Sequence, residues 1–265
     1  MIRPRTRRRE QLGEFLTSRR RVRQRSAVGL PSSARNGDAG LSREEVATLS
    51  GVSATWYTWL EQGRDTNVSR QVITAVARVL DLSEAETDYV RSLLEGEDVP
   101  WDEKPAELSD SLQRLLDALD FPAFAVAPDW TIAGWNAGYE WLYPAITTIE
   151  KADRNLIWLI YTDPALRGML PDWEADSRHF LAEFRVESGV RLSTPRHRAL
   201  IDRLSAASED FRKQWAELTI ERFASRRRAF DHHKDGFIEF DHHRLIPSED
   251  SRLHVVMYVP VVPDR

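Results

Sequence analysis

The chain contains no cysteine, and none of its 265 residues belongs to an apolar run long enough to cross a membrane. Without cysteine there is no disulfide framework, thiolate metal site or cysteine nucleophile, and we expect a cytoplasmic location. A membrane span needs roughly 18 uncharged apolar residues, and the N-terminal arginines are not followed by the apolar segment of a signal peptide. We therefore expect neither membrane insertion nor secretion.

Motifs of three common catalytic classes are missing too. The chain has no Gly-x-Ser-x-Gly elbow, no phosphate-cradling glycine loop and no His-Glu-x-x-His pair. Seryl, nucleotide and zincin chemistry therefore have no sequence support. We expect no enzymatic activity, no catalytic residue and no resident cofactor.

The composition is that of a folded protein with an uneven charge. It is 42% hydrophobic and 30% charged, far from the range of disordered chains. Residues 1–35 hold eleven arginines against Glu10 and Glu14, a net charge of about +9, so the rest carries about −14 of the overall −5. A basic front end of this kind suits a partner rich in phosphates.

Turn residues and helix caps divide the sequence into four parts. Residues 1–9 are a basic arm, either a solvated disordered tail or an arm that follows phosphates or the minor groove. Residues 10–95 show five helical patterns, the first over Glu10–Arg25, with capping boxes at Ser42 and Ser83. Residues 96–107 lack periodicity and are expected to be a linker. Residues 108–265 form the second domain.

The stretch REEVATLSGVSATWYTWLEQGR, residues 43–64, has the spacing of a helix-turn-helix. Ala47 allows two helices to cross closely, and Gly51 supplies the positive φ that the turn requires. The apolar positions that hold the two helices together are Val46, Val52, Tyr57 and Leu60. The alternative without a DNA-binding role is an ordinary helical hairpin within a larger bundle.

This packing predicts which residues face DNA. The second helix of the motif would turn six residues to base edges in the major groove: Ser53, Ala54, Thr55, Thr58, Trp59 and Gln62. Arg43 and Arg64 are placed for phosphates, which fix register without carrying sequence information. Because one helix-turn-helix domain reads only a short site on double-stranded DNA, we expect a homodimer.

The second domain is predicted to be α+β. Two short strands separated by a Pro-Asp turn precede a helix capped by Asn136, and residues 153–228 are helical in pattern. Two strand-length segments near the end, GFIEFDHH and RLHVVMYVPVV, complete an antiparallel sheet with helices on one side.

With these motifs the chain resembles the MmyB-like transcription regulators, in which a lambda-repressor-type helix-turn-helix precedes a PAS-like ligand-binding domain. The first domain matches in LGEFLTSRR, LSREEVATLSGVSATWYTWLEQGRD and SRQVITAVARVLDL, and the second in LQRLLDAL, WNAGYEWL, RNLIWLIYTDP and Asp172-Trp173. The lead into the second helix departs from the family, because Ser42 replaces an arginine and removes one expected phosphate contact. The resemblance implies a regulator whose effector is a small, apolar, fatty-acid-like ligand.

A PAS-like domain holds its ligand between sheet and helices, where apolar walls meet a few polar groups. The large side chains that could line such a cavity are Phe124, Trp135, Tyr143, Trp158, Tyr161, Trp173, Phe180 and Phe184. Arg154 and Asn155 could meet a carboxylate head group. The alternative for each aromatic residue is plain core packing, and for Arg154 a surface ion pair.

Two repeated tripeptides, Asp231-His232-His233 and Asp241-His242-His243, raise the question of a metal site. Adjacent strand residues point to opposite faces, so only one histidine of each pair could face a common site. We favour the interpretation that these are half-exposed strand histidines over the interpretation that they bind a metal. Two other hypotheses stay open: a cytoplasmic enzyme or metal-binding protein with a helical interaction module, and a PAS-like domain with a filled core that serves dimerisation.

Overall fold

The computed structural model describes residues 4–32, 37–38, 40–64, 68–95, 107–189, 191 and 194–261. The chain divides into two compact units, one of Met1–Pro100 with Gly189–Arg198 and the other of Trp101–Ser188 with Ala199–Arg265. The sequence does not indicate that residues 189–198 group with the first unit. Within the described ranges no helix has both the length and the apolar character that a membrane span requires.

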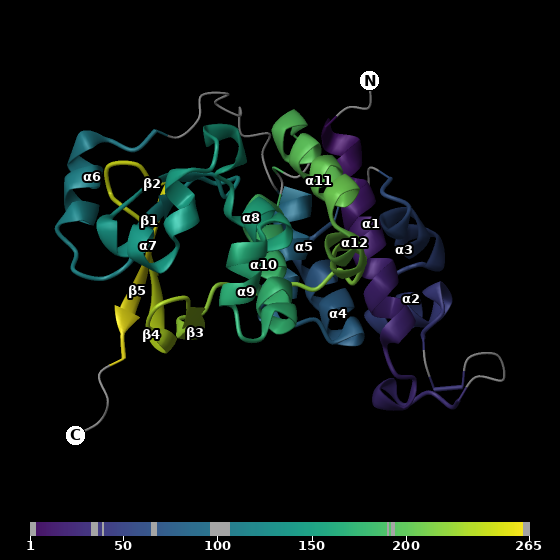
Figure 1. Ribbon diagram of the computed structural model, residues 1–265. Coiled ribbons are helices and arrows are strands. Elements are labelled where there is room, and N and C mark those ends of the chain that lie inside the picture. The colour runs from purple at the N-terminus through teal and green to yellow at the C-terminus, as the bar shows by residue number, and fades with distance from the viewer. Residues whose placement is uncertain are drawn as a thin grey trace. The chain divides into compact units, whose positions relative to one another are not determined.

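The first unit is helical, as the sequence predicts (Figure 1). Its described elements are α1 (Pro4–Val22), the 3-10 helix η1 (Ser26–Val28), α2 (Arg43–Ser50), α3 (Ala54–Glu61), α4 (Arg70–Leu80) and α5 (Glu84–Glu95). The predicted helix-turn-helix is the pair α2 and α3.

The first helix differs in extent from the expectation. α1 begins at Pro4 instead of Glu10 and ends at Val22, so residues 4–9 of the expected basic arm are helical. Proline suits the first helical turn, where its missing N–H would be unpaired in any case. The rest of the arm, residues 1–3, lies outside the described residues.

The predicted caps are present in the first unit. The Ser42 hydroxyl accepts a hydrogen bond from the Glu45 backbone N–H, and the Glu45 carboxylate accepts one from the Ser42 N–H. Ser83 and Glu86 repeat the same capping box, and the Ser53 hydroxyl caps α3. These bonds satisfy N–H groups that a helix start otherwise leaves without a partner.

The turn between α2 and α3 has the geometry that its residues demand. Gly51 has φ of 69°, in the left-handed region that glycine adopts at little cost. The predicted packing positions Val46, Ala47, Tyr57 and Leu60 are buried, and Val52 is half-buried. They pack with the buried α1 residues Leu12, Phe15 and Leu16 into the core of the unit.

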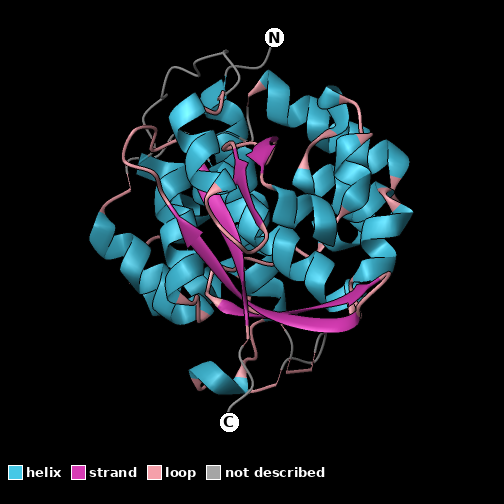
Figure 2. Ribbon diagram, turned by 60° about the vertical axis from the view of Figure 1, so that its left-hand side comes forward, coloured by secondary structure: helices cyan, strands magenta, loops and turns pink. Residues whose placement is uncertain are grey.

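The second unit combines helices with one antiparallel sheet (Figure 2). Its helices are α6 (Asp110–Asp117), α7 (Ala137–Leu142), α8 (Leu156–Thr162), α9 (Pro164–Met169), α10 (Trp173–Ser188), α11 (Pro195–Ala207, which begins in the segment grouped with the first unit) and α12 (Glu209–Ala216), with 3-10 turns η2 (Pro144–Thr147) and η3 (Lys151–Asp153). The strands β1 (Ala123–Val126), β2 (Ile132–Trp135), β3 (Arg226–His232), β4 (Gly236–Leu245) and β5 (His254–Pro260) pair in the order β2-β1-β5-β4-β3.

Both faces of this sheet carry helices, which corrects the expectation of helices on one side only. Ala123 and Ala125 of β1 pack with Leu112 and Leu116 of α6. The opposite face is covered by α10, because Arg228 of β3 bonds to a carboxylate of that helix. Side chains alternate between the two faces along each strand, so the face opposite α10 is apolar and covered at β1 but carries the exposed Arg227, Asp231 and His243 on β3 and β4.

A second correction concerns β3, whose first three residues, 226–228, the sequence pattern placed in a helix. α12 ends at Ala216, Leu218 has φ of 53°, and β3 then pairs with β4 from Arg226 to His232. Three consecutive arginines in RRRAFDH favour helix on propensity, but alternate residues of this strand are buried against the sheet's inner face. Tertiary packing therefore overrides the local preference.

Asn136 joins three segments around the start of α7, the helix that it was predicted to cap. Its side-chain oxygen accepts hydrogen bonds from the N–H groups of Tyr139 and Ala123, each 3.0 Å long. Its amide nitrogen lies 3.1 Å from the Leu116 carbonyl oxygen and 2.9 Å from that of Phe121. One buried amide thus fixes the end of α6, strand β1 and helix α7 together.

Candidate functional sites

The predicted base-reading residues form an exposed face on α3. Four of them are exposed, Thr58 is half-buried, and the Trp59 side chain is 41% exposed. The exposed residues besides Trp59 are Ser53, Ala54, Thr55 and Gln62. Arg64 is also exposed and holds its guanidinium 6.0 Å from the Trp59 ring centroid. The structure brings these residues together; that they read bases remains a prediction.

Arg43, predicted to contact phosphate, is part of an ion-pair cluster that we call the Glu61 cluster, made of Arg20, Arg43 and Glu61. Arg43 Nε lies 2.6 Å from Glu61 Oε2, and Arg20 Nε lies 2.5 Å from Glu61 Oε1. The other two Arg20 nitrogens bond to Glu61 Oε2 and to the Leu41 carbonyl oxygen. The sequence gives no signal for this cluster, since its members are 18 and 41 positions apart from Glu61.

The Glu61 carboxylate is fully buried yet ionised. Burial alone would raise the pKa of Glu61, but the hydrogen bonds from Arg20 and Arg43 hold it below its ordinary value. The Arg43 side chain is 41% exposed, so it can also reach solvent or a phosphate. The cluster ties the end of α3 to α1 and to the start of α2.

Gly13 allows α1 and α3 to approach closely, which the sequence reading missed. A Cβ atom at this position would lie 2.1 Å from the Glu61 backbone oxygen. No real Cβ tolerates that distance, so any other residue would push α3 away from α1. The inner side of the predicted reading helix is therefore fixed by backbone contact as well as by the Glu61 cluster.

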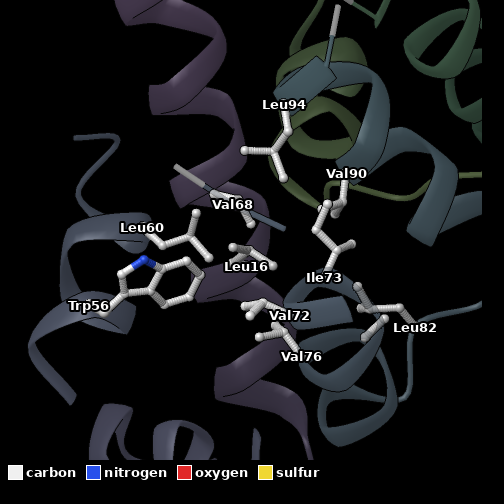
Figure 3. A pocket seen from close by; sticks show the side chains of 11 residues that line it. Leu16, Trp56, Leu60, Val68, Val72, Ile73, Val76, Leu82, Val90 and Leu94 are labelled. Carbon is white, nitrogen blue, oxygen red and sulfur yellow. The ribbon is translucent and has the colours of Figure 1, made fainter. Parts of the chain in front are cut away.

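The first unit also holds a small apolar cavity behind α3 (Figure 3). Trp56 and Leu60 of α3 face Leu16 of α1 and Ile73 of α4 across it. The volume open to the centre of a water molecule is about 10 Å³, so the cavity has room for a single water. With that volume and a lining almost entirely of hydrocarbon, it is a packing defect and not a place for an effector.

The residues predicted to bind a ligand lie in the second unit and fall into separate groups. Phe124 packs with Tyr139, their ring centroids 4.4 Å apart, and the Tyr143 ring meets the Tyr139 ring edge-on at 6.2 Å. Phe180 and Phe184 both meet the ring of Trp130 edge-on. These side chains are buried, and whether they contact a ligand remains a prediction.

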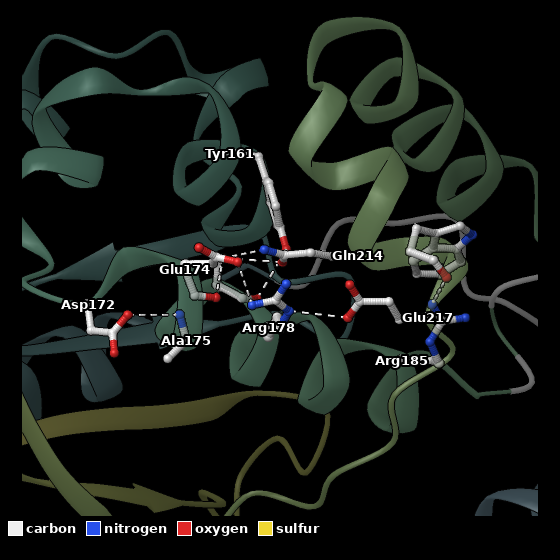
Figure 4. A network of polar contacts seen from close by, with 10 residues as sticks. Tyr161, Asp172, Glu174, Ala175, Arg178, Arg185, Gln214 and Glu217 are labelled. Carbon is white, nitrogen blue, oxygen red and sulfur yellow. Dashed lines mark hydrogen bonds and ion pairs between the residues drawn. The ribbon is translucent and has the colours of Figure 1, made fainter. Parts of the chain in front are cut away.

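Tyr161 and Trp173 belong to a further group, which is tied into a polar network between α8, α10 and α12 (Figure 4). The Tyr161 hydroxyl donates to the Ser177 carbonyl oxygen at 3.1 Å and also meets the Gln214 side chain. Arg178 of α10 bonds to Glu174 and to Glu217. Tyr161 and Trp173 are thus part of the framework that holds these helices together.

The two predicted head-group residues have structural partners. Asn155 caps α8 by accepting from the Trp158 N–H, and its amide donates to the Asp129 carbonyl oxygen at 2.6 Å. Arg154 Nε donates to the Ile149 carbonyl oxygen, and its guanidinium lies 5.0 Å from the Trp135 ring centroid. The half-buried Trp158 ring is covered by Arg203, 3.8 Å away.

A different arginine, Arg228 of β3, is the largest side chain that is fully buried among the described residues. Its Nη1 atom lies 2.6 Å from Asp176 Oδ1 of α10, and the ring centroid of Phe180 lies 3.9 Å from the guanidinium carbon. Its Nε and Nη2 atoms are buried and have no hydrogen-bond partner among the described residues. The assignment of residues 153–228 to helix hid this strand arginine from the sequence reading.

Arg228 shares the inner face of the sheet with His242 and Tyr258. His242 pairs with Tyr258 of β5 on one side and with Arg226 of β3 on the other. Burial, with the nearby charges of Arg228 and Arg226, lowers the pKa of His242 to about 3, so its ring is neutral at neutral pH. Its Nδ1 atom is buried and has no partner among the described residues either.

The two histidine pairs differ from the half-exposed strand histidines that we expect from the sequence, and His233 lies in the turn after β3. His232 and His242 are buried, whereas His233 and His243 are exposed. His232 Nε2 lies 2.8 Å from the Trp141 carbonyl oxygen. Within the part of the chain that the structure describes, no three metal-ligating side chains gather.

Comparison with known proteins identifies both units. Residues 11–90 match the profile of a helix-turn-helix domain, and residues 108–264 match that of the MmyB-like transcription regulator ligand binding domain. No curated protein matches the chain. The MmyB-like profile covers more than half of the sequence. The residues that it matches follow the helix-turn-helix pair α2–α3 in the same chain. The protein therefore belongs to the MmyB-like family of helix-turn-helix transcription regulators.

Proposed function

We propose that this protein is a sequence-specific regulator that binds operator DNA as a homodimer, with α3 in the major groove, and responds to a fatty-acid-like ligand in its second unit. The exposed face of α3 carries the proposal. Thr55, Trp59 and Gln62 follow one another at helical spacing there, while the opposite side of α3 is buried. Its role is regulatory and not catalytic.

Two-fold pairing of the chain would allow a small helix-turn-helix domain to recognise a DNA site long enough to be specific. A dimer places two recognition helices one turn of DNA apart, so its operator is expected to be a pseudo-palindrome. A ligand alters DNA occupancy only if it binds the two conformations of the dimer with different affinity. The second unit supports the sensor role with its PAS-like combination of an antiparallel sheet and covering helices.

Selection from random duplex DNA tests the reading function. The full chain is mixed with random duplexes at fixed salt, because phosphate contacts depend on salt, and bound DNA is sequenced. We expect an enriched, two-fold-symmetric motif. Thr55→Ala should change the preferred bases, whereas Thr74→Ala, an exposed threonine on α4, should leave them unchanged.

Absence of enrichment by folded protein, with and without added fatty acid, would contradict the proposal. Native mass spectrometry of gently purified protein tests the sensor part separately. A co-purified lipid of one chain-length range is expected. Two results together would contradict the sensor part: every preparation shows the mass of the protein without a lipid, and titration detects no lipid binding. The second unit would then be a dimerisation domain with a filled core.

A further inference from the structure

We infer that Trp59 reads the methyl group of a thymine in the major groove, so that each operator half-site has one position where thymine is selected by that methyl group. This inference rests on the DNA-reading role proposed above and names the chemical group that the α3 face recognises. It starts from an apolar ring that the fold leaves in contact with solvent, because the Trp59 side chain is 41% exposed between Thr55 and Gln62.

The three aromatic residues of α3 have different surroundings. Tyr57 is buried, and the half-buried Trp56 lines the apolar cavity behind the helix (Figure 3). Trp59 lies nearly opposite Tyr57, because two helical positions correspond to a rotation of about 200°. Packing within the first unit therefore uses the rings of Trp56 and Tyr57 and leaves the outer side of the Trp59 ring open.

Trp141 of α7 shows how an exposed tryptophan can serve the fold instead. It is 39% exposed, its ring lies 4.4 Å from the His232 ring, and its Nε1 donates to Asp235 at 3.1 Å. The contact at Trp59 is looser, since the Arg64 guanidinium carbon lies 6.0 Å from the ring centroid, at the outer limit of a cation–π interaction. The outer side of the Trp59 ring is thus available to a partner.

The charges around Trp59 favour DNA as that partner. Arg64 is exposed, and the Arg43 side chain is 41% exposed where it bonds to Glu61 at the end of α3. Glu61, the one acidic residue of α3, is buried and paired with arginines. Two exposed cations beside an uncharged face match the phosphates that border a groove, with the base edges opposite Trp59.

Among the groups in the major groove, the thymine methyl group suits an indole ring best. Guanine, cytosine and adenine present hydrogen-bonding groups there, whereas thymine presents an acceptor and an apolar methyl group. The indole has one N–H donor and no acceptor, so hydrogen bonding gives it little basis for choosing among bases. Contact between ring and methyl group removes apolar surface from water and favours thymine.

The place of Trp59 along α3 also calls for a long side chain. A recognition helix contacts base edges mainly with its N-terminal residues, and here Ser53, Ala54 and Thr55 are exposed and short. Trp59 lies one turn after Thr55 on the same side of the helix. The large ring spans the greater distance to the groove floor that we expect at this position.

Replacing single thymines of the selected operator by deoxyuridine tests the inference. Uracil pairs as thymine does and lacks only the methyl group. Affinity of the full chain for each duplex is measured by fluorescence anisotropy at fixed salt. Loss of the methyl group that Trp59 contacts should weaken wild-type binding about fourfold in one half-site and about fifteenfold in both.

A second base tests the same methyl group. At the thymine position identified with deoxyuridine, 5-methylcytosine should bind the wild-type protein about fourfold more tightly than cytosine, because its methyl group occupies the same place in the groove. Trp59→Ala should abolish both differences, between thymine and uracil and between 5-methylcytosine and cytosine. Trp59→Phe, which keeps an aromatic ring, should retain most of each.

Val22→Ala is the matched control, because it removes another exposed apolar side chain of the first unit. It should keep the full difference between thymine and uracil. If Trp59→Ala does not fold, Trp59→Gln provides the comparison with a polar side chain that is well tolerated in helices. It should also bind the two duplexes with equal affinity.

Three outcomes would overturn the inference. They are an operator in which no thymine depends on its methyl group, a Trp59→Ala or Trp59→Gln protein that keeps the preference for thymine over uracil, and a Trp59→Ala protein that is monomeric in sedimentation where the wild type is dimeric. The last would assign the ring to an interface between two copies of the chain. The first two leave the DNA-reading proposal standing, whereas failure to select any operator would remove that proposal itself.

Discussion

Two arginines, the half-buried Arg20 of the first unit and the fully buried Arg228 of the second, illustrate different uses of the same side chain. Arg20 directs every nitrogen to a protein acceptor and shares the buried Glu61 with Arg43. Arg228 uses Nη1 alone and leaves Nε and Nη2 without a protein partner in the described residues. A network in which every donor is paired holds the packed helices in place, whereas buried donors without a partner weaken the packing around them.

The largest expected effect comes from breaking the fully paired network. Glu61→Gln should lower the free energy of unfolding of the helical unit by about 3 kcal/mol, because it removes the buried carboxylate that the half-buried Arg20 guanidinium is paired with. Hydrogen exchange localised to α1 and α3, alongside chemical denaturation, measures the loss. Glu209→Gln, which removes an exposed ion pair with Lys213, should produce no measurable change. Equal effects would mean that the Glu61 cluster is not structural.

A backbone change tests the same region without touching charge. Gly13→Ala should destabilise the helical unit by about 1–3 kcal/mol, because the new methyl group would overlap the Glu61 carbonyl oxygen. Gly168→Ala in α9 meets nothing within 4 Å and should be neutral or stabilising by up to about 1 kcal/mol. Thermal unfolding of both variants checks the pair. A stable Gly13→Ala protein would show that α1 and α3 can separate freely.

Acid should weaken the second unit through His242. Its folded pKa of about 3 lies below the ordinary 6.5, so the unfolded chain binds the proton more readily. The contribution of His242 to stability is complete above pH 6.5 and is lost as pH falls towards 3, by up to about 1.4 kcal/mol per pH unit. Unfolding between pH 7 and 4 measures the slope. His242→Phe should flatten it, and an unchanged slope would contradict the assignment.

The smallest effect is expected at Arg43, whose partner Glu61 keeps Arg20 when Arg43 is lost. Arg43→Ala should weaken binding to all DNA sequences alike and reduce the salt dependence of log affinity by about one phosphate contact. Affinity measured across a salt series on selected and random duplexes checks this. A change in preferred sequence instead would assign Arg43 to base reading.

The helical unit could be predicted closely from the sequence because its signals are local. The serine caps, the Gly51 turn and the buried positions of α2 and α3 each follow from residues within a few positions of one another. α1 was underestimated because an arginine run gives no amphipathic pattern. Gly13 was missed because its close contact is with α3, far along the chain.

The second unit was harder to predict because its decisive contacts are long-range. β1, β2 and the Asn136 cap follow from local turn chemistry and are present. β3 is stabilised by pairing with β4 and by contacts to α10, neither of which a window of sequence contains. The sequence pattern therefore gives no sign that Arg228 is a buried strand residue, whereas Arg154 and Asn155 belong to a recognisable motif.

The close contact at Gly13 also bears on how this regulator can evolve. Because α3 is held from its inner side by the α1 backbone and by the Glu61 cluster, the side chains on its outer face contribute little to keeping the helix in place. Substitutions at Thr55 or Gln62 are then nearly free of folding consequences. If that face reads bases as proposed, duplicated copies of this gene can diverge to new operators by changing it alone, while the second unit stays the same.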